Sequence, residues 1–224
     1  MINKNEYIRL CSELLPKGVK IVAVSKRQPE DKITEFYGLG QRIFGENRAQ
    51  DLKDRYQNLP HDIEWHMIGH LQSNKIKYIA PFVSLIHSAD NLSLLQMIDK
   101  EAAKNNRIID FLLQIFIAQE ETKSGFSEYE VKKLLESKEI LSLDNINLCG
   151  LMGMATFTDD EKQVGKEFNG LRKLYDNLKR NYVANHTQFN ILSMGMSDDY
   201  RIALAEGTTM VRIGTLIFGE RDYK

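Results

Sequence analysis

Lys26 is the residue with the clearest chemical potential in this chain. It closes the hydrophobic run IVAVSK (residues 21–26), which has the composition of a buried strand. An amine that is partly desolvated at the end of such a strand has a lowered pKa, so more of it is the free base that attacks a carbonyl group. On its own the pattern is equally typical of a lysine that merely reaches solvent where a strand ends.

Two segments near the C-terminus contain the residue types of a phosphate cradle. They are SMGMS (residues 193–197) and RIGT (residues 212–215). Glycines allow close approach of the backbone, the hydroxyl groups of Ser197 and Thr215 donate hydrogen bonds, and amides at a helix start bind a dianionic phosphate. An amine that faces such a cradle indicates an aldehyde cofactor held covalently.

Two members of this set also have plain structural interpretations. Ser197 precedes Asp198 and Asp199, whose charges oppose an anion unless they point away, so Ser197 is equally an N-cap for the next helix. Arg212 would be costly to bury at the end of a strand unless it is paired, and Glu46 or Asp198 is a candidate partner.

Short apolar runs alternate with amphipathic stretches along the whole chain. Residue types typical of N-caps occur at Asn91 and Thr158, each near the start of an amphipathic stretch. Strands are predicted at residues 21–25, 42–45, 64–68, 83–87, 111–117, 146–151, 189–193 and 210–213. Helices are predicted at residues 30–37, 48–57, 74–79, 92–105, 128–137, 160–182 and 198–206, with an additional N-terminal helix at residues 3–15.

This alternation predicts an α/β fold made of parallel βαβ units. Eight strands in about 200 residues fit a single (β/α)8 TIM-type barrel with an extra N-terminal helix, in one domain that spans residues 1–224. An open doubly wound sheet is the alternative, because periodicity does not show closure. Nearly every polar cluster follows a predicted strand, and in a barrel these strand ends meet on one face, where active sites lie.

Composition excludes several function classes. The 224 residues carry a formal net charge of -1, with 42% hydrophobic and 27% charged residues, so no positive field favours nucleic acid as a partner. Cys11 and Cys149 are far apart and predict neither a disulfide framework nor a zinc site. No signal peptide and no run of the ~18 apolar residues of a membrane helix is present, so we expect a cytoplasmic protein without a membrane partner.

Two short patterns resemble known functional motifs but do not match them. His66 and His70 are four residues apart, but Met67 replaces the glutamate of a zinc protease motif, and a core histidine is the simpler interpretation of one of them. The GLG sequence at residues 38–40 precedes a strand instead of following one, so it is not a dinucleotide-binding loop. No metal site is predicted.

The chain resembles the pyridoxal 5'-phosphate homeostasis protein family, which comprises single-domain relatives of the alanine racemase barrel. The resemblance extends from about residue 21 to residue 223. It rests on the segments AVSK (23–26), FGEN (44–47), WHMIGHLQSNK (65–75), KSGF (123–126), GLM (150–152), LSMGMSDD (192–199), MVRIGT (210–215) and IFG (217–219).

The resemblance implies that pyridoxal 5'-phosphate (PLP) is the cofactor of a fold type III protein. It implies that Lys26 forms the internal aldimine, a Schiff base, with this cofactor. It also implies that Ser197, Gly214 and Thr215 bind the phosphate group.

Two further residues receive roles from the resemblance. Arg212 is implied to lie near the pyridine nitrogen, and Asn47 to contact the ring region. The chain departs from the family pattern at Arg48-Ala49, at Phe116 and at Ala155-Thr156. These positions lie beside the expected site, so the departures concern contacts at its rim.

The expected function is a non-catalytic role in vitamin B6 and amino-acid homeostasis, as a monomer that holds PLP and releases it to apo-enzymes. An arginine at the pyridine nitrogen keeps that nitrogen unprotonated and weakens the ring as an electron sink. In the racemase relatives a second base comes from an added β-domain and a dimer partner, and we expect no room for such a domain before Lys224.

Two other functions remain open at this point. A small PLP-dependent amino-acid racemase or lyase would act through Lys26 alone or with His70. A sugar- or phosphate-binding barrel would hold no covalent cofactor. Lys75 and Lys123 follow the third and fifth predicted strands, and either is a candidate transient acceptor during release, or simply a solvated loop lysine.

Overall fold

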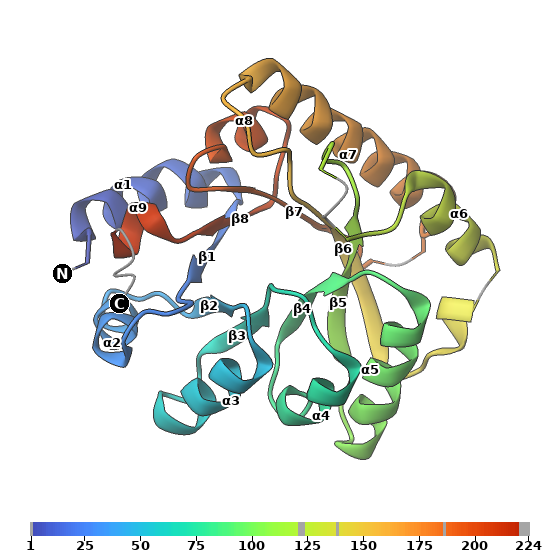
Figure 1. Cartoon of the computed structure of the whole chain (residues 1–224), viewed down its shortest axis with the longest axis horizontal. Coiled ribbons are helices and arrows are strands. Elements are labelled where there is room, and N and C mark those ends of the chain that lie inside the picture. The colour runs from blue at the N-terminus through green and yellow to red at the C-terminus, as the bar shows by residue number, and fades with distance from the viewer. Residues whose placement is uncertain (1, 121–123, 138, 186, 220–224) are drawn as a thin grey trace.

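The strands form a closed barrel, as predicted, and not an open sheet. The computed structural model describes residues 2–120, 124–137, 139–185 and 187–219. Eight strands follow one another around the barrel in chain order, and every neighbouring pair is parallel, including the closing pair β1 and β8 (Figure 1). Parallel neighbours place all the carboxyl ends of the strands on one face.

All eight predicted strands are present. The eighth has the predicted bounds, and the others have shifted ends. The largest shift is in the seventh strand, which extends to Met196 because Met196 pairs with Arg212 of the eighth. The strands are β1 Lys20–Val24, β2 Ile43–Glu46, β3 Glu64–Met67, β4 Leu85–Ala89, β5 Ile109–Ile115, β6 Ile146–Gly153, β7 Ile191–Met196 and β8 Met210–Ile213.

The helices cover the outside of the barrel (Figure 1). They are α1 Lys4–Leu14, α2 Glu30–Gly38, α3 Ala49–Asn58, α4 Ile76–Ile79, α5 Leu92–Lys104, α6 Glu128–Glu136, α7 Glu161–Asn181, α8 Tyr200–Ala205 and α9 Thr215–Phe218, with 3-10 segments at Leu15–Lys17, Ser73–Lys75 and Glu139–Ser142. The extra N-terminal helix is α1, as predicted. Helix α9 was not predicted, because its four residues are too few to show a helical period.

Side-chain caps confirm one predicted helix start and correct another. The Asn91 side chain accepts a hydrogen bond from the backbone of Leu94 at 2.8 Å and caps α5. For α7 the predicted cap, Thr158, is wrong. Asp160 caps that helix by accepting from the amides of Lys162 and Gln163, and a carboxylate at this position also suits the positive end of the helix dipole.

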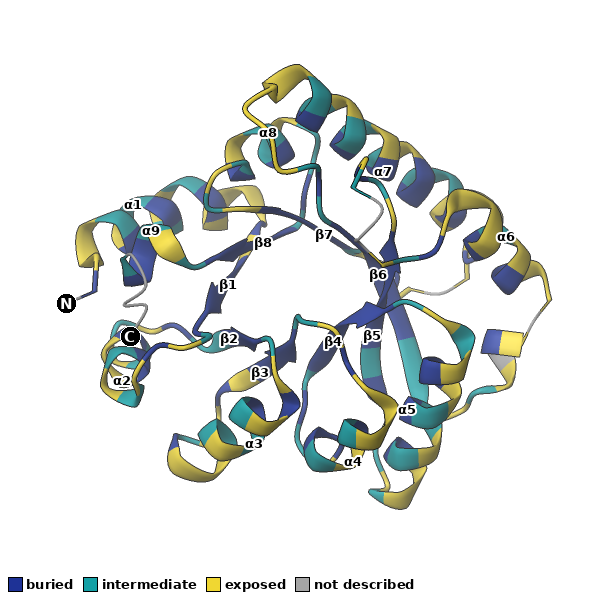
Figure 2. Ribbon diagram, in the orientation of Figure 1, coloured by how far each residue is buried: buried dark blue, intermediate teal, exposed yellow. Residues whose placement is uncertain are grey.

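The hydrophobic core has two layers. Alternate strand residues such as Ile21 and Ala23 face the helices, whose buried sides turn toward the sheet while their outer sides are exposed (Figure 2). Val22 belongs to a separate cluster of strand side chains inside the barrel. Its buried members are Val22, Leu85, Leu112, Cys149, Met152 and Met210. This inner packing makes the barrel a rigid support for the residues at its rim.

Neither a membrane-spanning helix nor a metal cluster is found in the part of the chain that the structure describes. Among those residues no helix has both the length and the apolar character needed to cross a bilayer. The same residues contain no group of three or more histidine, cysteine or acidic side chains placed to hold a metal ion. Both cysteines are free thiols.

Candidate functional site

The predicted site residues lie on four adjacent strands at the carboxyl face of the barrel. Strand β7 neighbours β8, β8 neighbours β1, and β1 neighbours β2. Around this arc the site residues are Ser197 after β7, Arg212 in β8, Gly214 and Thr215 after β8, Lys26 after β1, and Asn47 after β2. The structure therefore brings together residues that are up to about 190 positions apart in the chain.

Lys26 lies in a turn just beyond β1, and not in the strand itself. The amide of Gln28 closes this turn by donating to the carbonyl of Ser25 at 2.9 Å. Arg27 has a positive φ of 60°, so the chain reverses direction immediately after Lys26. The Lys26 side chain is half-buried. This turn places an amine at the rim of the barrel, next to the end of β8.

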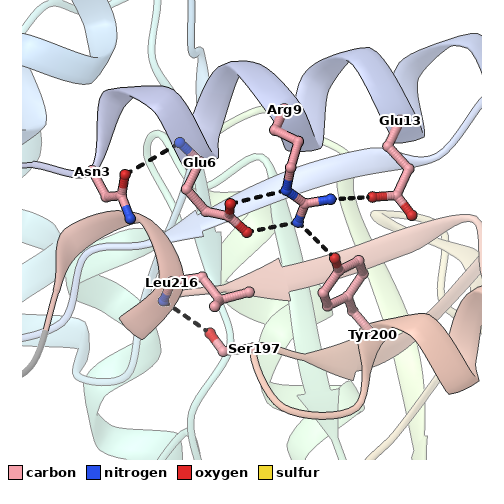
Figure 3. A network of polar contacts seen from close by, with 7 residues as sticks. All are labelled: Asn3, Glu6, Arg9, Glu13, Ser197, Tyr200 and Leu216. Atoms are coloured by element: carbon pink, nitrogen blue, oxygen red, sulfur yellow. Dashed lines mark hydrogen bonds and ion pairs between the residues drawn. The ribbon is translucent and has the colours of Figure 1, made fainter.

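Ser197 binds the start of α9 and does not cap α8. Its Oγ accepts a hydrogen bond from the amide of Gly214 at 3.2 Å. It also accepts one from the amide of Leu216 at 3.5 Å, which Figure 3 shows. Helix α8 begins only at Tyr200, so the predicted N-cap role of Ser197 is wrong. The serine hydroxyl thus joins the end of β7 to two amides that follow β8.

Asp199, the second acidic residue after Ser197, is directed to its own turn. The carboxylate of Asp199 accepts a hydrogen bond from the Met196 amide at 2.5 Å. Gly195 has φ +94°, and a Cβ there would lie only 2.6 Å from the Cβ of Ala203. A glycine is therefore required for α8 to pack against the end of β7, and this packing fixes the position of Ser197.

The N-terminal helix α1 contacts both α8 and α9, the helices after β7 and β8 (Figure 3). Arg9 donates to the Tyr200 hydroxyl of α8 at 2.8 Å and forms ion pairs with Glu6 and Glu13 at 2.6 Å each. The backbone N–H of Asn3, which precedes α1, donates to a carbonyl of α9 at 2.7 Å. Helix α1 therefore stabilises the arrangement in which Ser197 meets the start of α9.

Arg212 is buried and hydrogen-bonded to carbonyl and hydroxyl oxygens. Its Nη1 donates to Ser193 O at 2.9 Å and to Ser193 Oγ at 2.8 Å, and its Nη2 donates to Gly153 O at 3.0 Å. The predicted carboxylate partners, Glu46 and Asp198, are therefore wrong. Burial lowers the pKa of Arg212 to about 10, so the guanidinium group is still protonated at neutral pH.

Two buried histidines continue this polar contact into the barrel. His87 Nδ1 lies 3.2 Å from Ser193 Oγ, and His87 Nε2 lies 3.0 Å from His66 Nδ1. Burial lowers the pKa of His66 to about 3 and that of His87 well below its usual value, so both rings are neutral. The prediction that one of His66 and His70 is a core histidine is confirmed, and the core histidine is His66.

The guanidinium group favours one arrangement of protons along this chain of hydrogen bonds. Arg212 can only donate, so Ser193 Oγ accepts from it and keeps its own hydrogen available for His87 Nδ1. In that arrangement His87 carries its proton on Nε2 and donates to His66. A second proton on His66 Nδ1 would then face the Nε2 proton of His87, so neutral histidines suit this chain. Sequence reasoning missed His87 and assigned Ser193 only to the phosphate cradle, because only the fold shows that Ser193 lies between Arg212 and His87.

Glu46 is a second buried polar group at the rim. It ends β2 with no exposed surface, and Ser25 donates its hydroxyl hydrogen to Glu46 Oε1 at 2.7 Å. Arg55 Nε lies 3.7 Å from the same oxygen. Burial raises the pKa of Glu46 to about 7. Sequence reasoning treated this residue only as part of a motif and as a partner for Arg212, and its distinctive environment was missed.

Asn47 lines a pocket of about 440 Å³ beside the ends of β2 and β3. His70 and Lys75 line the same pocket, and His70 Nδ1 lies 3.5 Å from the carboxylate of Asp90. A Cβ on Gly69 would overlap the carbonyl oxygen of Asn47, so a glycine is needed where these two loops touch. The pocket gives Asn47 access to a ligand at the barrel rim.

Sequence comparison decides the family. Residues 6–222 match the family model described as the alanine racemase N-terminal domain. Over 222 residues the chain is 43% identical to the pyridoxal phosphate homeostasis protein of Aquifex aeolicus. This match covers 97% of this chain and 95% of that protein. The chain belongs to the pyridoxal phosphate homeostasis protein family. The predicted resemblance is thereby confirmed.

Solved structures agree with this membership in the pyridoxal phosphate homeostasis protein family. PipY of Synechococcus elongatus PCC7942 has a TM-score of 0.88 without PLP and 0.85 with PLP bound, at 32% identity, and the matches cover 96% of this chain and 99% of PipY. An alanine racemase of Clostridium difficile 630 has a TM-score of 0.74 at 18% identity, over 93% of this chain and 53% of the racemase, which shows a shared barrel fold.

Proposed function

We propose that this protein binds PLP and has a non-catalytic role in PLP and amino-acid homeostasis. In this proposal Lys26 holds the cofactor covalently, and the protein releases it to apo-enzymes. The observation that carries the proposal is the placement of an amine after β1 beside the hydroxyl and amide groups after β7 and β8. The homeostasis names of the relatives and the PLP-bound structure of PipY support it.

The donors of the cradle suit a phosphate group. The hydrogen bonds from Gly214 and Leu216 to Ser197 Oγ are long, at 3.2 and 3.5 Å, so these amides hold their present acceptor weakly. A phosphate oxygen is a stronger, charged acceptor for the same amides, and the serine hydroxyl can then donate to it. The exposed Thr215 hydroxyl is a further donor at the same place.

Arg212 suits a ring nitrogen that stays unprotonated. PLP supplies an aldehyde that reacts with amines and a pyridine ring that withdraws electrons. The contacts of Arg212 with Ser193 and Gly153 use three N–H groups, and a guanidinium group has five, so donors remain for a ligand. A cationic donor at the ring nitrogen limits electron withdrawal, which favours a carrier over a racemase or lyase.

The proposal includes the wider setting of the protein. We expect a cytoplasmic monomer with one domain over residues 1–224, whose partners are PLP and the apo-enzymes that receive it. Lys75, in the pocket beside Asn47, remains a candidate transient acceptor, although its ammonium group also lies 5.5 Å from the centre of the Tyr78 ring. The other candidate, Lys123, lies outside the described residues.

Titration of the purified protein with PLP tests this function. We expect one equivalent of PLP to produce an absorption band of a protonated imine, which borohydride removes. Pyridoxine 5'-phosphate, whose alcohol cannot form an imine, is the control and should bind without this band. Equal binding of both compounds with no band would support the phosphate-binding barrel instead. Exchange of amino-acid α-protons in deuterated water, above the rate with free PLP, would support the racemase or lyase.

Ser197→Ala should weaken PLP binding by about tenfold. The variant loses one charge-assisted hydrogen bond, worth roughly 1.5 kcal/mol, but frees the amides of Gly214 and Leu216 for the phosphate. Thr215→Ala should have a smaller effect, because the backbone amides of Gly214 and Leu216 remain as donors. The dissociation constants of both variants and of the double variant measure these effects. If all three bind PLP as tightly as the parent, the phosphate lies elsewhere.

A further inference from the structure

Glu46 is a buried carboxyl group with no part in the phosphate and ring contacts proposed above. Only its Oε1 is hydrogen-bonded, by the Ser25 hydroxyl, while Oε2 is buried without a hydrogen-bond partner among the described residues. A carboxylate oxygen without a donor is costly to bury, so this environment favours the protonated acid. An acid of this kind is ready to take up and give back a proton.

The hydrogen bond from Ser25 does not by itself require a carboxyl group at this position. The oxygen that accepts from Ser25 could equally belong to a glutamine. Burial raises the pKa of Glu46 to about 7, against the effects of the Ser25 hydrogen bond and of the Arg55 and Lys26 charges, and Asp51 adds to the rise. The group therefore titrates near neutral pH, where a residue transfers protons most effectively.

Glu46 lies next to the turn that carries Lys26. Val24 of β1 pairs with Gly45 of β2, and the amide of Ser25 donates to the carbonyl of Gly45 at 3.0 Å. This register places Ser25 beside Glu46, where the 2.7 Å hydrogen bond joins their side chains. Lys26 is the next residue, and its charge acts on the carboxyl group of Glu46.

Two other charged groups near Glu46, Arg55 and Asp51, lie on α3. Arg55 of α3 is shared, with its Nε 3.7 Å from Glu46 and its Nη1 3.5 Å from Glu30, the first residue of α2. Asp51, also on α3, opposes ionisation of Glu46. Arg55 is therefore engaged by two carboxylates, and it only partly offsets the burial of the Glu46 carboxyl group.

We propose that Glu46 is the proton-exchange partner of Lys26, an inference that rests on the proposed function of Lys26 as the amine that binds the cofactor. The Glu46 carboxylate accepts one proton from the Lys26 ammonium group through an intervening water molecule. An N–H bond breaks, an O–H bond forms, and neither residue is oxidised or reduced. The neutral amine then has the lone pair that attacks an aldehyde. Glu46 acts through Lys26 and does not itself bind the cofactor.

The Glu46→Gln variant should distinguish a role of Glu46 in proton exchange from a purely electrostatic effect of its charge on Lys26. With this variant, loading of PLP onto the apo-protein at pH 7, followed by absorbance, should be at least tenfold slower and should lose its inflection near pH 7. Acetylation of Lys26 in the apo-protein, quantified by peptide mass spectrometry, should be as fast or faster, because loss of a nearby negative charge favours the free amine. A purely structural or electrostatic role would change both rates in the same direction.

A stability measurement on the apo-protein tests the titration without any cofactor. The folded pKa of Glu46, about 7, lies above its usual value of 4.5, so the folded protein holds a proton that the unfolded chain releases between these values. The stability of the parent relative to Glu46→Gln should therefore fall as the pH rises from 4.5 to about 7, and then stay constant. A relative stability that does not change over this range would contradict the inference.

Two variants control the loading experiment. Glu30→Gln removes the other carboxylate bound to Arg55 and should load PLP like the parent. Glu46→Asp keeps an ionisable group and should retain an inflection in the pH profile, which tests the inference even if the glutamine variant folds poorly. Glu46→Gln loading at the parent rate with the parent pH profile would overturn the inference. A parent that loads no PLP at any pH would instead contradict the proposed function itself.

Discussion

Lys26→Ala should abolish covalent retention of PLP and leave the barrel folded. The alanine variant has no amine at the rim after β1, so borohydride should leave no PLP adduct on the protein. The residue lies in a turn beyond the strand and is half-buried, so its removal should change the free energy of unfolding by only about 0.5 kcal/mol. Mass spectrometry of borohydride-treated protein and urea denaturation measure the two effects.

Lys75→Ala is the matched control for this experiment. Lys75 lies at the same face of the barrel, in the pocket beside Asn47, and it should not be needed for the adduct. The parent and Lys75→Ala should both carry one adduct on the peptide that contains Lys26. An adduct that survives in Lys26→Ala would show that another lysine binds the aldehyde.

The fold could be predicted because its signals are local and repeated. Each strand is a short apolar run, each longer helix has an amphipathic period, and eight repeats in this length fit one architecture. What failed depended on contacts between distant segments. The end of β7 at Met196 is set by pairing with β8, and α9 is too short to have a period. The N-caps predicted at Ser197 and Thr158 were wrong, because each residue had a plausible local role.

Residues of the proposed site could be selected from the sequence only where residue type alone suggests chemistry. An amine, a hydroxyl group and glycines after strands led to the selection of Lys26, Ser197 and Gly214. The neighbours of Arg212 could not be found in this way, because its acceptors come from β6 and β7. For Glu46, no sequence pattern shows that one oxygen of a carboxyl group is buried without a donor.

The hydrogen-bond partners of Arg212 make a substitution at this position a test of folding stability. A glutamate at this position would protonate the pyridine nitrogen of PLP and strengthen electron withdrawal, if it could be accommodated. In the structure its carboxylate would face the carbonyl oxygens of Ser193 and Gly153, which accept hydrogen bonds and cannot donate them. The oxygens around this position need a hydrogen-bond donor. The main expected effect of Arg212→Glu is therefore a loss of folding stability, and not a change in the electron withdrawal of PLP.

Arg212→Glu should therefore destabilise the protein by about 3–5 kcal/mol, since it leaves buried acceptors unsatisfied and adds an unpaired buried charge. Arg212→Lys keeps the positive charge and one donor group, and should cost less than half as much. Urea denaturation of both apo-variants measures the difference. Equal destabilisation by the two variants would mean that the side-chain volume of Arg212, and not its hydrogen bonds to β6 and β7, supports the barrel. The expected difference would instead show that the hydrogen bonds of Arg212 to β6 and β7 stabilise the barrel, with the same cation that is proposed to lie at the ring nitrogen of the cofactor.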